Sequence, residues 1–363
     1  MPFPSFFKET SNTYLAVFSV SFLFLSLALW VGPGFTYDSH DYFLAGTNLK
    51  DFLQGRIING KLIARPPLFP ILVRIFSLPG KWGLSIMQLV IFSMNCMLFY
   101  RIIFRVEWLD TFRLVLFILF CFSISMHLSH SFLWTEGLVI LLILIQVYFL
   151  IADIFFLKKL AGLLFFGAAM VLTKNGGMLL VPGFAAAMIL LDKNWKMVVL
   201  SVLYLGINFS MYSLWNAHVS RPTVLETVAR DRFFTAEYIH VISGWLFPLA
   251  IPEIFRVLLL GIFIGGLIIS GSFRCLWKDR IWVSFFIIFL SYVLFRSYYS
   301  HVSYHEGERY LSLGFPFFLL WVTGLLAKSK TRPVLFFIFY WIIYSVIRVI
   351  KNDIIWFLER SQM

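Results

Sequence analysis

Two carboxylates near the start of the chain are spaced so that they can act together. The stretch Thr36-Tyr37-Asp38-Ser39-His40-Asp41-Tyr42 follows an apolar run, and Asp38 and Asp41, three residues apart, would share one helix face. Partial burial raises the pKa of a carboxylic acid toward the range that suits proton abstraction. The pattern predicts Asp38, or alternatively Asp41, as a general base, with His40 as a substrate contact. A solvated helix cap is the competing interpretation, because Asp and Ser are favourable N-cap residues.

Arg65 is the next residue with a chemical interpretation. It begins the run Arg65-Pro66-Pro67-Leu68-Phe69-Pro70, in which the prolines end a polar loop and Pro67 suits the first turn of a helix. A cation at a helix start lies beside the positive end of the dipole and can help to hold a phosphate. Arg65 is therefore a candidate phosphate ligand, although the prolines are also ordinary helix punctuation.

Glu136 and Lys174 interrupt apolar runs farther along the chain. Glu136 heads a long apolar segment, and Lys174 stands in Thr173-Lys174-Asn175-Gly176-Gly177. An ionisable group in an apolar span is a functional candidate by default, and glycines let backbone amides approach an anion. Alternatively, Glu136 pairs with a cation on a neighbouring helix, and the glycines only form a tight turn.

A dense group of donors, acceptors and rings precedes a late apolar run. Its candidate substrate or phosphate ligands are His301, His305, Glu308, Arg309 and Tyr310. The histidines, four apart, have a spacing that can bind a metal on a helix. No helix signal precedes Glu308, however, so a divalent metal is not indicated and no cofactor is predicted. An interfacial aromatic belt is the alternative for the tyrosines.

The composition indicates whether the chain lies in water or in a lipid bilayer. Of 363 residues, 60% are hydrophobic and only 13% are charged, about half the charged share of a soluble domain. Such a chain needs a bilayer. The net charge of +12 is spread over short breaks between apolar runs, a pattern that predicts contacts with membrane lipids. Nucleic acid is therefore not expected as a partner.

The predicted fold class is all-α, because backbone groups in lipid must be satisfied within helices. The apolar runs predict about eleven membrane helices in a single transmembrane domain covering 1–363. Nine of them are expected at 14–32, 83–104, 111–128, 132–152, 197–215, 250–271, 281–299, 309–327 and 333–350. The segment 160–191 is expected to form either a hairpin of two short helices or one long kinked helix.

The basic residues predict the orientation of the helices. If helices alternate, most of the lysines and arginines in the breaks fall on one side, which the positive-inside rule makes cytoplasmic. The other side receives a large first extracytoplasmic loop at 33–82 and a second outer loop at 216–249, with an interfacial helix expected in the second. Arg348 and Lys351 do not fit, since an odd number of helices places them outside.

Several of these motifs, in this order, resemble one family. Asp38-Ser39-x-x-Tyr42, Pro66-Pro67-Leu68-Phe69-Pro70, Thr135-Glu136, Thr173-Lys174-Asn175-Gly176 and Glu308-Arg309-Tyr310-Leu311 are similar to elements of the protein O-mannosyltransferase-like glycosyltransferases of the GT-C superfamily. The resemblance covers roughly residues 14–327. It departs at Asp38-Ser39, where the family has an acidic pair, and at Lys174-Asn175, where it has Arg-Pro.

The resemblance implies a membrane glycosyltransferase. Its donor would be a polyprenyl-phosphate sugar and its acceptor a glycan, a lipid or a protein. Asp38 would be the base of an inverting transfer on the extracytoplasmic face of a bacterial inner membrane. Two alternatives have a different chemistry, namely a lipid-linked-sugar flippase or transporter, and a non-catalytic subunit of a polysaccharide assembly system.

Overall fold

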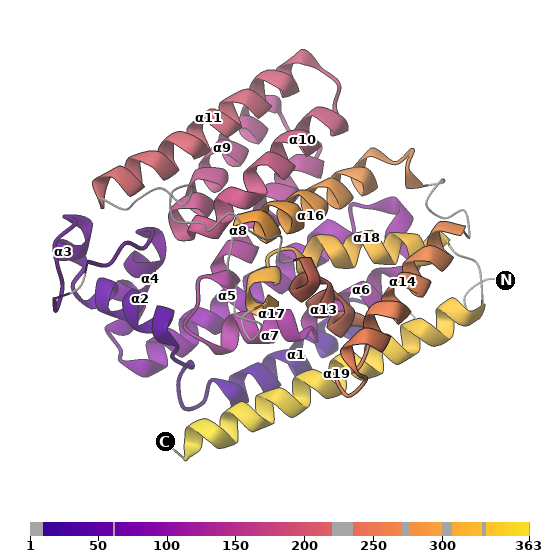
Figure 1. Ribbon diagram of the computed structural model, residues 1–363, viewed down its shortest axis with the longest axis horizontal. Coiled ribbons are helices and arrows are strands. Elements are labelled where there is room, and N and C mark those ends of the chain that lie inside the picture. Colours follow the sequence, from indigo (N-terminus) through magenta and orange to yellow (C-terminus); the bar gives the residue numbers. More distant parts are fainter. Residues whose placement is uncertain are drawn as a thin grey trace.

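The computed structural model describes residues 10–60, 62–219, 235–269, 276–299, 307–328 and 332–362, and the regular elements of this part are helices (Figure 1). In chain order they are α1 Ser11–Ala28, α2 Tyr37–Thr47, α3 Leu49–Leu53, α4 Leu68–Ser77, α5 Lys81–Ile103, η1 Glu107–Phe112, α6 Arg113–Cys121, α7 Ile124–Ser131, α8 Glu136–Ile151, α9 Phe156–Thr173, η2 Asn175–Leu180, α10 Val181–Leu191, α11 Trp195–His218, α13 Thr235–Leu246, α14 Glu253–Ile269, α16 Arg280–Tyr299, α17 Gly307–Leu311, α18 Phe315–Lys328 and α19 Arg332–Ser361.

Seven segments of the described chain are long and apolar enough to cross a membrane, so the chain is a multi-pass membrane protein. They are Ser11–Ala28, Trp82–Ile103, Glu107–Ser131, Phe156–Thr173, Trp195–His218, Arg280–Ser297 and Val334–Ser361. The other predicted spans are shorter. For example, the span expected at 132–152 is α8, whose 16 residues reach only about 24 Å. A bilayer core is about 30 Å thick, so the count of about eleven remains a prediction.

The ambiguous segment at 160–191 breaks where the glycines stand. α9 ends at Thr173, a short 3-10 helix follows, and α10 begins at Val181. A Cβ on Gly177 would lie 2.8 Å from the Met170 carbonyl oxygen, so the glycine permits the chain to fold tightly against the end of α9. The segment therefore forms two helices, the first of the two alternatives, and not one long kinked helix. Lys174 lies in the turn between them.

The first predicted outer loop is mostly helical and contains α2, α3 and α4 (Figure 1, left). The Thr36 backbone N–H donates to Ser39 Oγ at 3.0 Å, and the two hydroxyls lie 3.1 Å apart. Because these residues cap α2, the capping interpretation of Asp38 and Asp41 is wrong. α2 also packs on α4, which brings its carboxylates toward Arg65.

A short backbone pairing fastens the start of α2 to the start of α8. The Gly34 N–H donates to the Ser131 carbonyl at 2.8 Å, and the Leu133 N–H donates to the Gly34 carbonyl at 2.9 Å. The Trp134 indole N–H then donates to Thr36 Oγ1 at 2.8 Å. These contacts place two segments nearly a hundred residues apart in sequence at one end of the bundle.

The C-terminal helix α19 is longer than the predicted span 333–350 and lies along α1 (Figure 1, bottom). Fully buried polar contacts connect the two helices through α7. Asp353 Oδ2 lies 2.6 Å from His127 Nδ1, and His127 Nε2 lies 3.0 Å from Ser21 Oγ. The Ser21 hydroxyl donates to the Cys121 carbonyl. His127 is thus a structural residue of the bundle.

We expect Gly34→Ala to destabilise the protein by about 1–3 kcal/mol, the usual effect of overpacking. A Cβ at Gly34 would lie 2.5 Å from the Phe132 ring and 2.6 Å from Arg360 Nη2. The free energy of unfolding, measured by SDS titration in mixed micelles, checks this. Gly206→Ala is the matched control, because a Cβ there would meet no described neighbour within 4 Å and alanine favours a helix interior. Equal stabilities of the two variants would contradict the prediction.

Candidate functional site

Six ionisable side chains from five parts of the chain meet at one end of the bundle, and we call them the charged cluster. Its members are Asp38 and Asp41 of α2, Arg65 before α4, Glu136 at the start of α8, Lys174 directly after α9, and Arg309 of α17. All six are among the residues that the sequence singled out. Folding thus brings together residues separated by up to 271 positions, the interval from Asp38 to Arg309.

The two α2 carboxylates share the Arg65 guanidinium. Arg65 Nη2 pairs with Asp38 Oδ1 and lies 2.9 Å from Asp41 Oδ2, and its Nε donates to the same Asp41 oxygen at 3.2 Å. The Arg65 carbonyl accepts a hydrogen bond from the Trp215 indole at 2.9 Å. The prediction that Asp38 and Asp41 share one helix face is confirmed. Arg65 is fixed at its guanidinium by these two carboxylates and at its backbone carbonyl by Trp215.

Arg309 connects this group to the membrane helices. Its Nη2 lies 2.8 Å from Asp38 Oδ2, and its Nε lies 2.6 Å from Glu136 Oε1. Lys174 Nζ pairs with the same Glu136 oxygen. The Arg309 guanidinium also lies over the Trp134 ring, with 4.4 Å from Cζ to the ring centroid. Glu136 therefore pairs with cations of neighbouring elements, as the alternative to a functional role predicted. Arg309 is a partner that Glu136 shares with Asp38.

A cavity of about 370 Å³ opens beside the charged cluster. Its lining residues are Asp38, Tyr42, Arg65, Pro66, Lys174, Asn175, Gly176, Met178, Leu179, Pro182, Phe209, Tyr212, Phe295, Arg296 and Tyr310. Three cations and one carboxylate face this space. The cavity can therefore receive an anion close to a carboxylate that can act as a base.

The cavity has a second, apolar wall that reaches the outside of the bundle. Phe209 of α11 is 55% exposed and Phe295 of α16 is 36% exposed, and both line the cavity. Met178, Leu179 and Pro182 also line the cavity and add to its apolar surface. These exposed aromatic side chains give the cavity an apolar opening of the kind that an aliphatic chain can enter.

Arg296 was not identified from the sequence, although the structure makes it one of the three cavity-lining cations. It belongs to the last turn of α16, is 9% exposed, and its Cζ lies 4.0 Å from the Tyr310 ring centroid. Lys174 Nζ lies 5.2 Å from the same centroid. A lone arginine near the end of an apolar span is the signal that could have found it. Tyr310, a predicted site residue, thus lies beside two cations at the cavity.

The charge state of Asp38 differs from the expectation. Burial by itself would raise the pKa of this carboxyl, but the positive charges of Arg65 and Arg309 outweigh burial and hold its pKa below the usual value. The prediction of a raised pKa is wrong, because it considered desolvation without the guanidinium partners. Asp38 is therefore ionised at neutral pH, in the form that accepts a proton.

Some predicted residues lie elsewhere. His40 is exposed on α2 and packs on Phe35, with ring centroids 5.4 Å apart, outside the cavity lining. Glu308 does not line the cavity and instead pairs with Arg348 at 2.7 Å. Asp41 contacts Arg65 behind the cavity wall. His301 and His305 lie outside the described residues. Within the described ranges no group of three His, Cys, Asp or Glu side chains is arranged to hold a metal ion.

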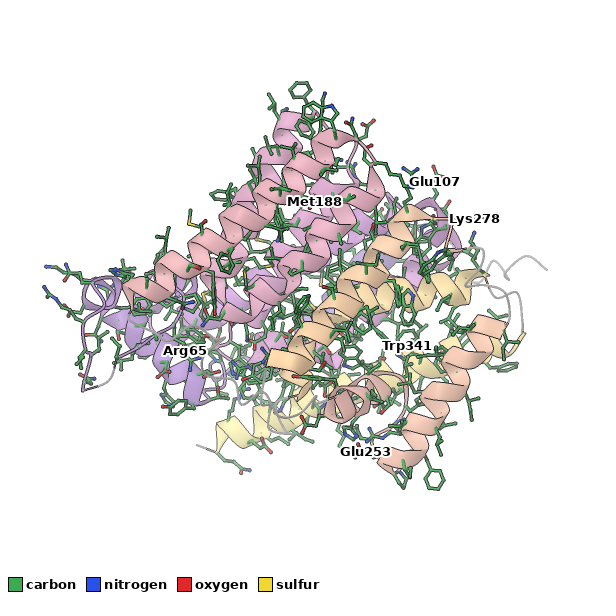
Figure 2. The ribbon with its side chains drawn as sticks, turned by 45° about the horizontal axis from the view of Figure 1, so that its top comes forward. Arg65, Glu107, Met188, Glu253, Lys278 and Trp341 are labelled. Atoms are coloured by element: carbon green, nitrogen blue, oxygen red, sulfur yellow. The ribbon has the colours of Figure 1, made fainter. Side chains whose placement is uncertain are left out.

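The opposite end of the bundle is basic. Lys159, Lys278 and Arg280, with the two carboxylates Asp192 and Asp279, border one open cleft where α9 and α16 begin, so cations are in excess there. Both helices run from this cleft to the cavity, α9 ending beside Lys174 and α16 in the turn that carries Arg296. Figure 2 shows Lys278 and Glu107 at the end of the molecule away from Arg65. α9 and α16 therefore extend through the bundle from this cleft to the charged cluster.

Comparisons with known proteins support the fold. The structure is similar to ArnT from Cupriavidus metallidurans, whose crystal structure was determined bound to undecaprenyl phosphate, with a TM-score of 0.61 at 12% sequence identity. The match covers 89% of this chain and 61% of the ArnT chain. No protein-family model matches the chain, and no curated protein sequence matches it significantly. The similarity supports an all-α, polytopic membrane fold like that of ArnT.

Proposed function

We propose that this protein is a membrane glycosyltransferase that moves a sugar from a polyprenyl-phosphate donor to an acceptor hydroxyl. The observation that carries this proposal is the cavity in which Asp38 faces Arg65, Lys174 and Arg296, with an apolar wall leading to the lipid side. The fold shared with ArnT, crystallised with undecaprenyl phosphate, supports a lipid phosphate as the ligand. The acceptor is a glycan, a lipid or a protein.

The charges in the site suit a phosphodiester. The charged cluster has three cations and three carboxylates, and Arg296 adds one positive charge at the cavity. A sugar joined to a polyprenol through one phosphate carries a single negative charge, which balances this excess. Arginine forks and a lysine ammonium are the usual protein ligands of such a group.

The arrangement supports an inverting transfer. Asp38 accepts the proton of the acceptor hydroxyl while that oxygen attacks the anomeric carbon from the face opposite the phosphate. The bond between the anomeric carbon and the phosphate oxygen breaks, and its electron pair stays on the phosphate. Arg65, Lys174 and Arg296 stabilise the developing charge, and such preorganised electrostatic stabilisation is usually the largest catalytic contribution.

The basic cleft at the other end of the bundle supports one orientation of the protein in the membrane. Lys159, Lys278 and Arg280 belong to breaks that the positive-inside rule assigns to the cytoplasm. The charged cluster then faces the extracytoplasmic side of a bacterial inner membrane, and the donor's phosphate lies at the level of the head groups.

We expect transfer to decline as the pH rises through about 8. Burial, and secondarily the positive charge of Arg309, lowers the pKa of Lys174 to about 8, although Glu136 opposes this. Lys174 is charged below that pH and loses its proton above it, so the phosphate loses one cation. Lys174→Arg should keep transfer active at pH 9, since a guanidinium remains protonated. The pH profile of kcat for the two proteins checks this, and identical alkaline limbs would contradict it.

The proposed function is tested by purified protein in nanodiscs incubated with polyprenyl-phosphate sugars and candidate acceptors. Mass analysis of lipids and glycans should find the sugar transferred and polyprenyl phosphate released. Undecaprenyl phosphate should also bind, and Arg296→Gln should bind it more weakly than Arg56→Gln, an exposed arginine paired with Asp51. Movement of the lipid across vesicles without transfer would indicate a transporter, and binding without turnover a non-catalytic subunit.

A further inference from the structure

We infer that Arg348, on the C-terminal helix α19, is a positioning residue that holds Arg309 at the charged cluster by way of Glu308. The catalytic part of this inference rests on the proposed function. Arg348 lies outside the cavity lining. It is also one of the two basic residues that contradicted the orientation predicted from the sequence, so its charge needs a structural reason on that side of the membrane.

The contact that carries the inference is an ion pair between α19 and α17. Arg348 Nη2 lies 2.7 Å from Glu308 Oε2, and Arg348 Nη1 donates to the Gly244 carbonyl at 2.9 Å. The two side chains are 13% and 23% exposed, so solvent screens this pair less than it screens a surface ion pair. Arg348 therefore binds α17 and the last turn of α13 at the same time.

Arg348 belongs to one face of α19 that binds α13. Trp341, Tyr344 and Arg348, spaced three and four residues apart, lie on one side of the helix. The Trp341 indole donates to the Trp245 carbonyl at 2.8 Å, and the Tyr344 hydroxyl donates to the Gly244 carbonyl at 2.9 Å. These carbonyls belong to the end of a helix, where no backbone N–H is left to satisfy them. α19 thus completes the hydrogen bonding of α13.

α13 in turn packs on α17. A Cβ built on Gly307 would lie 3.0 Å from the Val241 side chain of α13, so the α17 backbone packs tightly against that side chain. α17 has only five residues, too few for a helix that is stable by itself. Its position is consequently set by what it contacts on each side.

Consecutive residues of α17 face different partners. Glu308 pairs with Arg348 of α19, while Arg309 pairs with Asp38 and Glu136. The backbone between them transmits any displacement of Glu308 to the Arg309 guanidinium. A misplacement of about 1 Å can reduce catalysis by about 100-fold. The ion pair of Arg348 therefore has a catalytic consequence without any contact between Arg348 and the substrate.

The test is a charge exchange across the ion pair. Arg348→Glu and Glu308→Arg each place like charges together, and each should reduce kcat by about 10- to 100-fold, as expected for misplacement, with a smaller change in KM. The double variant restores opposite charges and should recover most of the activity. Hydrogen exchange of the α17 amides should accelerate in each single variant and slow again in the double variant.

The acid limb of the pH profile separates positioning from a general loss of structure. Asp38 faces the cations Arg65, Lys174 and Arg309 and the acidic groups Asp41, Glu136 and Tyr42. When Arg309 moves away, the pKa of Asp38 rises and the acid limb of kcat moves to higher pH in Arg348→Glu. Arg360→Glu is the control on the same helix, since Arg360 donates to the Ala28 and Gly32 carbonyls of the α1 end, and it should leave this limb unchanged.

The outcomes distinguish the two proposals. Single variants with wild-type α17 exchange would overturn the inference whatever the activity, and so would a folded double variant that shows the same accelerated exchange as the singles. Wild-type protein that binds undecaprenyl phosphate but transfers no sugar would overturn the proposed function. Hydrogen exchange would still decide whether Arg348 positions α17.

Discussion

The Asp38→Asn variant is expected to lose transfer by about 10²- to 10⁴-fold, the range that removal of a general base produces. The amide keeps the size of the side chain but cannot accept the proton of the acceptor hydroxyl. Asp38 is the one carboxylate among the described residues that line the cavity, so none of the others can take over this role. Initial rates at saturating donor, with undecaprenyl-phosphate binding measured in parallel, check the expectation.

Asp41→Asn is the matched control for Asp38→Asn. Both residues lie on α2 and both bind Arg65, so each substitution removes one carboxylate from the same guanidinium. Asp41 does not line the cavity, and its variant should retain far more transfer. If the Asp41 variant were the inactive one, the base would be Asp41, and near-wild-type transfer by both would remove the carboxylate base from the mechanism.

The second large effect is expected at Arg309. Replacing it by Met should cost about 3–5 kcal/mol of stability, the usual result of removing one partner from a buried charge network. Arg309 is 2% exposed and binds Asp38 and the fully buried Glu136. Without it Glu136 keeps Lys174 and Asp38 keeps Arg65, so three carboxylates would share two cations. The free energy of unfolding in mixed micelles measures the loss.

Arg309→Lys and Arg56→Met bracket the result. Lysine retains the charge but not the planar fork that reaches two carboxylates, so Arg309→Lys should fall between the wild type and Arg309→Met. Arg56 forms an exposed pair with Asp51, with side chains 64% and 48% exposed, and such surface pairs contribute little. A stability of Arg309→Met equal to that of Arg56→Met would mean that the charged cluster does not hold the helices together.

Most members of the charged cluster could be predicted one at a time. Glu136 and Lys174 interrupt apolar runs, and Asp38 and Arg65 stand in a long polar break, so burial rules mark each as unusual. Arg296 follows the same rule but was missed, although it stands near the end of an apolar run that begins at the basic residues Lys278 and Arg280. The capping role of Thr36 and Ser39 was missed because Asp38 is an equally good capping residue by type.

Which residues pair could not be predicted. Asp38 has its pKa lowered rather than raised because two guanidinium groups from distant segments lie beside it. Glu308 and Arg309 are neighbours in sequence, yet one faces α19 and the other faces α2 and α8. Sequence spacing gives the face of an isolated helix but not the element that will cover it.

The sequence alone determined that this chain lies in a bilayer as helices, because apolar side chains and unsatisfied backbone groups leave no other solution. It also determined which ionisable residues stand at the helix ends. The tertiary structure decided the pairing of these charges, the cavity beside them and the contact of α17 with α19. Those features depend on contacts between segments far apart in sequence, whose energies are set only when the helices pack.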